Sequence, residues 1–322
     1  MRAVVVESFG GPEVLTAGEV ADPTPGDGEL LVKVAAAGVN YIDTYHRTGA
    51  YPMPTPFVPG LEGAGEVVAV GDGVSRFKVG DRVAWSAAIG SYAELAKVPE
   101  AGAVAVPDGV ELEVAAGAML QGMTAHYLTR STYAVQEGDT VLVHAAAGGM
   151  GLLLTQGVKA LGGRVIGTVS TAEKEKLARE AGADEIIRYT ETEIAPEVRR
   201  LTDGQGVHVV YDGVGKDTFD ASLASLRIRG TLALYGAASG PVPPFDLQRL
   251  NSAGSLFVTR PTLGHHVLTR EELDWRAGEV FAGIQAGKLT IRISGRYPLA
   301  DAAQSHEDLQ ARRTTGKLLL IP

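Results

Sequence analysis

The stretch Gly138–Lys159, GDTVLVHAAAGGMGLLLTQGVK, decides the fold class of this chain. Its apolar run Val141–Val143 is short and rich in β-branched residues, which is typical of a buried parallel strand. Small residues follow from Ala145 to Gly149, and the proline-free stretch Met150–Leu161 predicts a helix. The order strand, small-residue turn and helix predicts the start of an α/β unit.

The turn itself matches the dinucleotide-binding fingerprint, with alanine in the first position: Ala146-x-Gly148-x-x-Gly151. Small residues there allow a tight turn, a close approach of the backbone to a pyrophosphate and close packing of the helix on the strand. The helix N-terminus adds unpaired N–H groups and a partial positive charge. Because a tight turn can also serve the fold alone, the next strand has to support the interpretation.

Arg164–Val169 predicts the second strand, and the residues at its tip indicate which cofactor fits. An NAD site places Asp or Glu about 20 residues beyond the turn, where it binds the ribose hydroxyls. Here Ser170 follows the strand and Lys174 lies one helical turn further on. A hydroxyl and an ammonium bind a 2′-phosphate that a carboxylate would repel, so the sequence predicts NADPH over NADH. Alternatively, Ser170 caps the next helix with Glu173 at its third position and Lys174 is solvated; the two interpretations are compatible.

Composition bounds the function further. A chain of 322 residues suits about two domains, and a net charge of −9 argues against nucleic acid or an anionic membrane as partner. The absence of cysteine excludes disulfides, thiolate catalysis and cysteine-containing zinc sites. The N-terminal residues predict a strand rather than a signal peptide, and no apolar run is long enough to cross a bilayer. We therefore expect a soluble cytoplasmic protein.

The chain divides into three parts. Residues 1–124 carry short β-like runs between turn clusters, which predicts a small, mostly antiparallel β domain; the runs are Ala3–Val6, Leu30–Ala35, Gly65–Val70 and Arg82–Trp85. Residues 125–264 predict a doubly wound parallel sheet, with strands at 140–145, 164–169, 185–188, 207–211 and 230–235 and helices at 149–162, 171–181, 192–202 and 215–226. Residues 265–322 predict helices near 270–286 and 299–311 and a last strand at 317–321.

Several motifs together resemble the zinc-free quinone oxidoreductases, relatives of zeta-crystallin in the medium-chain dehydrogenase/reductase superfamily. The similar stretches span the chain: Ala37–Asp43, Pro59–Gly65, Val79–Val83, the signature Gly138-Asp139, Leu142, Ala146–Gly149, Gly151, Gln156 and Lys159, then Val210–Gly215 and Val258–Pro261. The resemblance implies a Rossmann domain inserted into a GroES-like, mostly β catalytic domain that both ends of the chain form. It also implies a cofactor in the interdomain cleft and a homodimer.

The zinc-dependent members of that superfamily differ at the metal. Where they place a cysteine ligand this chain has Asn40, and where they place a histidine it has Leu61 before Glu62. The histidines do not replace these ligands, because His265 and His266 are adjacent and the other five are scattered. We therefore predict no metal site.

Without a metal, the simplest chemistry is hydride transfer from NADPH to a quinone, a small electron-poor acceptor. Such a site needs a flat apolar slot, correct orientation and a hydrogen-bond donor. By resemblance this slot is lined by Asn40, Tyr41, Asp43, Tyr45 and Tyr51, of which we assign Asn40, Tyr45 and Tyr51 as catalytic. The alternative is that some of these tyrosines are ordinary packing residues.

The resemblance also implies the cofactor contacts. Besides Asn40, Tyr41, Asp43 and Tyr45, they are Tyr127, Gly148, Gly149, Met150, Gly151, Ser170, Lys174, Tyr189, Gly213, Gly236, Ala237, Ala238, Val258, Thr259, Arg260 and Arg312. Ser170, Lys174 and Tyr189 are expected around the 2′-phosphate and adenine ribose. Arg260 and Arg312 could instead be interface or surface cations. Two positions depart from the family pattern: Met150, where valine is commoner, and Gly213, where relatives often carry a hydroxyl residue.

Two other functions compete with quinone reduction. An NADPH-dependent enoyl or enone reductase would need a proton donor, and Tyr51 would become catalytic. A non-catalytic role, such as the RNA binding or lens-structural role of some zeta-crystallin relatives, belongs to another class. The acidic balance and the lack of a basic run argue against RNA.

Overall fold

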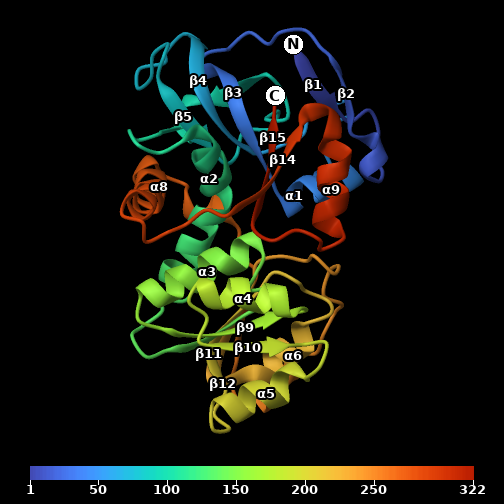
Figure 1. Ribbon diagram of the computed structural model, residues 1–322, viewed down its shortest axis with the longest axis vertical. Coiled ribbons are helices and arrows are strands. Elements are labelled where there is room, and N and C mark those ends of the chain that lie inside the picture. Colours follow the sequence, from blue (N-terminus) through green and yellow to red (C-terminus); the bar gives the residue numbers. More distant parts are fainter. The chain divides into compact units, whose positions relative to one another are not determined.

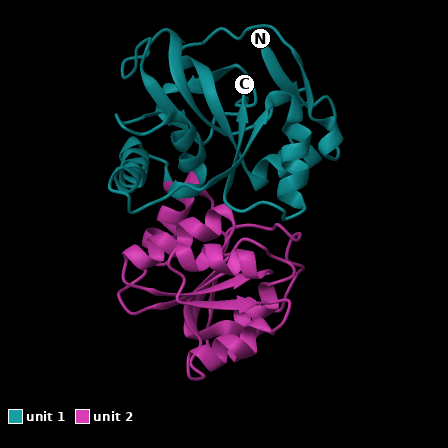
Figure 2. Ribbon diagram, in the orientation of Figure 1, with its two compact units in different colours: residues 1–123, 267–322 teal, residues 124–266 magenta.

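The computed structural model describes residues 1–322, which form two compact units (Figure 2). Unit 1 comprises residues 1–123 and 267–322, and unit 2 comprises residues 124–266.

Unit 1 is built on a seven-stranded sheet to which both parts of its chain contribute. Strand β15 (Lys317–Ile321) pairs antiparallel with β3 (Glu29–Val39), so that Leu318 lies opposite Val39. The remaining strands of this sheet are β4 (Glu62–Val70), β5 (Arg82–Trp85), β6 (Leu95–Pro99), β7 (Val104–Ala105) and β14 (Ile293–Pro298). All pairs are antiparallel except β14 with β15. Strands β1 (Arg2–Val5) and β2 (Thr16–Glu19) form a separate antiparallel pair.

The burial of β3 explains how the sheet positions the first half of the site. Leu30, Val32 and Val34 are buried, and the residues between them are more exposed, as expected for a strand with one face on the core. From Ala36 onward every residue is buried, and the strand delivers Asn40 into the interior at 2% exposure. Helix α1 (Tyr41–Thr48) begins directly after Asn40.

Three further helices belong wholly or largely to unit 1: α2 (Leu112–Tyr127), α8 (Arg270–Gln285) and α9 (Ala302–Gln310). Single 3-10 turns occur at Pro12–Val14, Glu100–Gly102 and Leu299–Asp301, and another at Leu263–His266 in unit 2, where a π turn, Leu128–Thr132, follows α2.

Unit 2 is a doubly wound parallel sheet, as predicted. Its six strands run in the order β10-β9-β8-β11-β12-β13, and every neighbouring pair is parallel. The strands are β8 (Thr140–Val143), β9 (Arg164–Val169), β10 (Glu185–Arg188), β11 (Val207–Asp212), β12 (Leu226–Leu234) and β13 (Phe257–Thr259). Helices α3 (Gly149–Ala160) and α4 (Ala172–Glu180) cover one face, and α5 (Ile194–Leu201) and α6 (Phe219–Ser225) cover the other (Figure 1). The short α7 (Gln248–Ser252) precedes β13. Because both faces are covered, β8 and β11 are buried along nearly their whole length, and three of the four residues of β8 are apolar.

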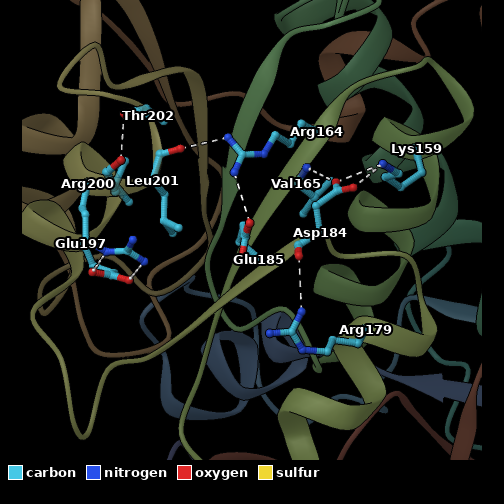
Figure 3. A network of polar contacts seen from close by, with 11 residues as sticks. Lys159, Arg164, Val165, Arg179, Asp184, Glu185, Glu197, Arg200, Leu201 and Thr202 are labelled. Carbon is cyan, nitrogen blue, oxygen red and sulfur yellow. Dashed lines mark hydrogen bonds and ion pairs between the residues drawn. The ribbon is translucent and has the colours of Figure 1, made fainter.

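A network of charged side chains lies at the end of this sheet where β9 and β10 begin (Figure 3). Asp184 accepts the Lys159 ammonium at 2.8 Å and the backbone N–H of Val165 at 2.7 Å. Arg164 donates to Glu185 at 3.2 Å and to the Leu201 carbonyl at 2.9 Å. These groups bind one another, so this edge serves the stability of the fold.

The elements differ from the prediction mainly at their ends. Strands predicted at 164–169, 185–188 and 317–321 are confirmed as β9, β10 and β15. The helix predicted at 215–226 begins only at Phe219, because Gly215 has a φ of 92° and the Asp212 carboxylate accepts its N–H in a turn. Helices α1, α2 and α7 and strands β2, β6, β7, β13 and β14 were not predicted. None of the helices combines the length and the apolar composition that crossing a membrane requires.

Candidate functional site

The turn after β8 lies at the carboxyl end of the strand and leads into α3, with Gly148 as the residue before the helix. Ala145 adopts a left-handed conformation with a φ of 49°. A Cβ atom at Gly151 would collide with the Ala145 carbonyl oxygen and would lie 2.6 Å from the Cα of Ala146. Only glycine therefore lets α3 pack this closely on the turn, and the first N–H groups of α3 stay available for an anion.

A chain of hydrogen-bonded, fully buried polar side chains supports this turn. Ser222 donates to the Asp212 carboxylate at 2.7 Å, so its oxygen accepts from His144 Nε2, 2.9 Å away. His144 Nδ1 then accepts from the Thr168 hydroxyl at 3.1 Å. Burial lowers the pKa of His144, which keeps the ring neutral, as this pattern requires. The chain ties together the carboxyl ends of β8, β9 and β11.

The tip of β9 corrects one prediction. Helix α4 begins at Ala172, and its cap is Thr171, whose hydroxyl oxygen accepts the Lys174 N–H at 3.3 Å; Ser170 is not the cap. The strand ends at Val169 and the chain needs two residues to turn into the helix, so the cap falls on the second hydroxyl residue. The Ser170 hydroxyl is therefore not used in capping. Tyr189 follows β10 beside this tip, since its N–H donates to the Val169 carbonyl at 3.1 Å.

The loops after β11 and β12 touch one another at the same edge. The Ala238 N–H donates to the Gly213 carbonyl at 3.1 Å, and a Cβ at Gly236 would lie 3.0 Å from the Gly213 Cα. A Cβ at Gly213 would lie 2.7 Å from the ring and hydroxyl of Tyr235. Tyr235 thus occupies the space that a side chain at position 213 would need.

Tyr127, at the end of α2, stacks on His266 with ring centroids 4.2 Å apart and planes within 6°. Its hydroxyl is close enough to Tyr235 to contribute to the raised pKa of that tyrosine, whose main cause is burial. Val258, Thr259 and Arg260 lie at the end of β13, with Thr259 level with Ala233 of β12.

The sequence-predicted residues of unit 2 therefore gather at one edge of the sheet, the carboxyl ends of its parallel strands. Strand order reverses between β8 and β11, and in open α/β sheets ligands bind outside the carboxyl ends at such a switch point. The amino-end edge carries none of them.

The predicted residues of unit 1 gather at the start of α1. Asn40 caps this helix, and its backbone N–H donates to the Asp43 carboxylate at 2.8 Å in a reciprocal capping box. The Asn40 side-chain amide donates to Glu62 at 2.8 Å and to the Gly38 carbonyl at 3.3 Å. Its oxygen accepts from the Lys317 ammonium at 2.7 Å, so the amide orientation is fixed.

Sequence reasoning missed Lys317 as a residue of the site. Its ammonium lies 2.5 Å from Glu62, and both side chains are at most 1% exposed. The other oxygen of Glu62 accepts the Leu120 N–H at 2.7 Å. Because 255 residues separate the partners, no local pattern links them.

Asp43 begins a second buried chain. Tyr92 donates to Asp43 at 2.9 Å and accepts from His306 Nε2 at 3.1 Å, and Arg47 donates to His306 Nδ1 at 3.2 Å. Burial lowers the pKa of His306 to about 3, with the Arg47 charge acting in the same direction. Burial raises the pKa of Asp43 to about 7, against the hydrogen bonds from Asn40 and Tyr92. Oxygen Oδ1 of Asp43 is buried without a partner.

The predicted tyrosines form a row. Ring centroids are 6.0 Å apart for Tyr41 and Tyr45 and 5.3 Å apart for Tyr45 and Tyr51, and residue Tyr51 is 44% exposed. Burial raises the pKa of Tyr41, whereas the charge of Arg312 lowers it, so the Arg312 guanidinium lies within electrostatic reach of this row. No three His, Asp or Glu side chains are grouped to hold a metal ion.

The fold and the site define a class: a nucleotide-binding doubly wound unit within a chain whose other unit is mostly β. Two family models match, "Zinc-binding dehydrogenase" over residues 149–276 and "Alcohol dehydrogenase GroES-like domain" over residues 26–108. Together with the relatives described next, they show that the chain belongs to the zinc-free quinone oxidoreductases of the medium-chain dehydrogenase/reductase superfamily.

Three relatives match over essentially their whole length. A quinone oxidoreductase of Pseudomonas aeruginosa is 50% identical over 100% of this chain and 99% of its own. A mycobacterial protein solved in complex with NADPH is 56% identical, covers 100% of both chains and has a TM-score of 0.98. A 2-haloacrylate reductase of a Burkholderia species is 42% identical over 100% of this chain and 99% of its own.

Proposed function

We propose that this chain is an NADPH-dependent quinone reductase. The relative from Pseudomonas aeruginosa is named a quinone oxidoreductase, and the mycobacterial relative was solved with NADPH. The observation that carries the proposal is the tip of β9, where Ser170 and Lys174 replace the carboxylate of an NAD site. Dependence on NADPH also supports a cytoplasmic location.

The carboxyl edge of unit 2 fits the nucleotide. The Gly148–Gly151 segment offers N–H groups to a pyrophosphate where a Cβ would obstruct the turn. In our assignment Ser170, Lys174 and Tyr189 bind the 2′-phosphate and adenine ribose. The loops 213–215 and 236–238 and the end of β13 take the nicotinamide, with Tyr127 and Arg312 as further contacts.

When bound, NADPH supplies a hydride, and a quinone that takes up this hydride and one proton leaves as the hydroquinone. The chain itself has to bind and orient the acceptor. The rings of Tyr45 and Tyr51 offer a flat apolar surface, and their hydroxyls can donate to a quinone oxygen. The Asn40 amide lies beside this row in an orientation that Lys317 and Glu62 fix.

Steady-state oxidation of NADPH by a series of quinones tests the activity. Lys174→Ala should weaken NADPH binding by about 1–3 kcal/mol, the scale of a charged hydrogen bond, and leave NADH nearly unaffected. If the wild-type protein binds NADH as tightly as NADPH, the assignment of the β9 tip is wrong.

The relative that reduces 2-haloacrylate favours a second candidate, reduction of an activated carbon–carbon double bond. This reaction needs a proton donor for the α-carbon, and Tyr51 has the most exposed ring of the tyrosine row. Assays of quinones against enones with wild type and Tyr51→Phe separate the two. Rapid turnover of enones, slow turnover of quinones and loss of activity in Tyr51→Phe would replace the first proposal with the second.

We also propose a homodimer through strand β13. This strand ends the sheet of unit 2, Phe257 on it is 61% exposed, and Ile228 on neighbouring β12 is 72% exposed. An open edge with apolar side chains can pair with the same edge of a second copy. Light scattering should give twice the chain mass, and Phe257→Lys should give a folded monomer. A monomeric wild type would refute this proposal.

A further inference from the structure

Arg188 lies beside the tip of β9. It is the last residue of β10, and its Cα lies level with Val169, the last residue of β9. Its neighbours continue this contact: the Tyr189 N–H donates to the Val169 carbonyl at 3.1 Å, and the Thr190 hydroxyl donates to the Ser170 carbonyl at 3.2 Å. Arg188 is therefore one residue from the place that we assign to the 2′-phosphate.

Two carboxylates face the Arg188 guanidinium. Its Nη1 lies 2.8 Å from Glu191 on the loop that follows, and its Nε lies 3.4 Å from Glu175 on α4. Glu175 is 25% exposed and also accepts from Arg179 at 2.9 Å, so it is held in place. Glu191 is 54% exposed. An arginine has more N–H donors than these two contacts use.

We propose that Arg188 is a further specificity residue for the cofactor: a guanidinium that leaves Glu191 to bind the 2′-phosphate of NADPH, with Glu191 as its internal competitor. The inference rests on the proposed NADPH-dependent function and deepens it.

The charges favour this exchange. An exposed ion pair is weak, because both partners are well solvated, and Glu191 can return to water at little cost. A phosphate dianion offers a guanidinium stronger, bidentate hydrogen bonds. Glu175 stays paired with Arg179 throughout, so Arg188 moves without leaving a buried carboxylate uncompensated. With NADH, which lacks the 2′-phosphate, Arg188 stays paired with Glu191.

The test measures binding of adenosine 2′,5′-bisphosphate and of 5′-AMP by calorimetry, since the two ligands differ only in the 2′-phosphate. Arg188→Gln should weaken the bisphosphate at least about tenfold and leave 5′-AMP within about twofold. Glu191→Gln should tighten the bisphosphate about two- to fivefold, because it removes the competitor. In the Arg188→Gln background the Glu191→Gln change should have no effect.

The chain offers a matched control. Arg200, 67% exposed, and Glu197, 23% exposed, form an ion pair on α5 with the same i, i+3 spacing, 2.7 Å apart (Figure 3). The charge of Glu185, the first residue of β10, acts on Arg200, so this pair lies near the opposite end of the strand from Arg188. Glu197→Gln and Arg200→Gln should leave both affinities unchanged.

The outcomes separate the two proposals. If wild type prefers the bisphosphate and Lys174→Ala abolishes that preference, but Arg188→Gln changes nothing or weakens both ligands equally, the inference about Arg188 is wrong and the proposed function survives. If wild type binds the bisphosphate no better than 5′-AMP, the proposed function fails first. Thermal unfolding of each variant confirms that these surface changes leave the fold intact.

Discussion

Lys317→Met is the most informative single change in unit 1. It removes the ammonium that compensates Glu62 and leaves a fully buried carboxylate with only the Leu120 N–H and the Asn40 amide as donors. Breaking a buried ion pair by removal of one partner costs about 3–5 kcal/mol. In a domain of about 150–250 residues each kcal/mol lowers the melting temperature by about 2–4 °C, so the expected decrease is about 6–20 °C.

The double variant Lys317→Met/Glu62→Gln is the decisive comparison. A neutral amide at position 62 still accepts the Leu120 N–H and leaves no unpaired charge, so most of the lost stability should return. Lys317→Arg keeps the charge and should lie between wild type and Lys317→Met. Differential scanning calorimetry measures all four proteins.

Stability alone does not test the effect on the site. If Lys317 and Glu62 fix the Asn40 amide, the double variant should be stable but should still show a reduced kcat/KM for quinone, as Asn40→Ala should. A Lys317→Met protein as stable as wild type, or a double variant less stable than the single one, would refute the reasoning.

Three further predictions concern single groups. Gly151→Ala should lower the free energy of unfolding by about 1–3 kcal/mol and weaken nucleotide binding, because its Cβ collides with the turn. Gly157→Ala on the same helix, whose Cβ would have no contact nearer than 3.8 Å, should be neutral or stabilising in chemical denaturation. The pKa of Asp43 is raised from 3.8 to about 7, so between these pH values the folded state binds a proton that the unfolded state has lost, and wild type should lose stability as pH rises through this window. Asp43→Asn should lack this loss in urea titrations. A stability difference between wild type and Asp43→Asn that does not change with pH would contradict the prediction. Thr171→Ala should destabilise the protein by about 1 kcal/mol, because α4 loses its cap. Ser170→Ala should leave stability unchanged and weaken the binding of NADPH. Equal losses of stability in the two variants would contradict the observed cap.

Strands of unit 2 were predicted well because their signal is local. Strands β9 and β10 have the bounds expected. Five of the six residues of β9 are buried between turn residues, and β10 at the edge of the sheet is an apolar pair between two charged residues. Helix α1 was missed because YIDTYHRT has no apolar stripe; the capping box of Asn40 and Asp43 specifies its start instead. Helix α2 was missed for the opposite reason, since it is apolar on nearly every side and has little periodicity.

The site divides in the same way. The turn from Ala145 to Gly151 is contiguous in sequence, and its steric demand on Gly151 follows from neighbours a few residues away. The buried groups of unit 1 come from distant strands and helices, and no pattern within a window of sequence relates Lys317 to Glu62 or His306 to Tyr92. Sheet register specifies the first of these pairs, through β15 against β3 and β3 against β4.

The nucleotide turn of unit 2 and the buried groups of unit 1 therefore differ in how they tolerate substitution. A nucleotide turn specified by a few adjacent residues can be altered, or have its cofactor preference shifted, by substitutions at the β9 tip that leave the core alone. The Asn40 amide, in contrast, is held by Lys317 and Glu62, whose side chains are almost fully buried, so a change of one partner exposes the other to an unpaired charge. We therefore expect the choice of cofactor to be adjustable one residue at a time, whereas the surroundings of Asn40 can change only when both partners change together.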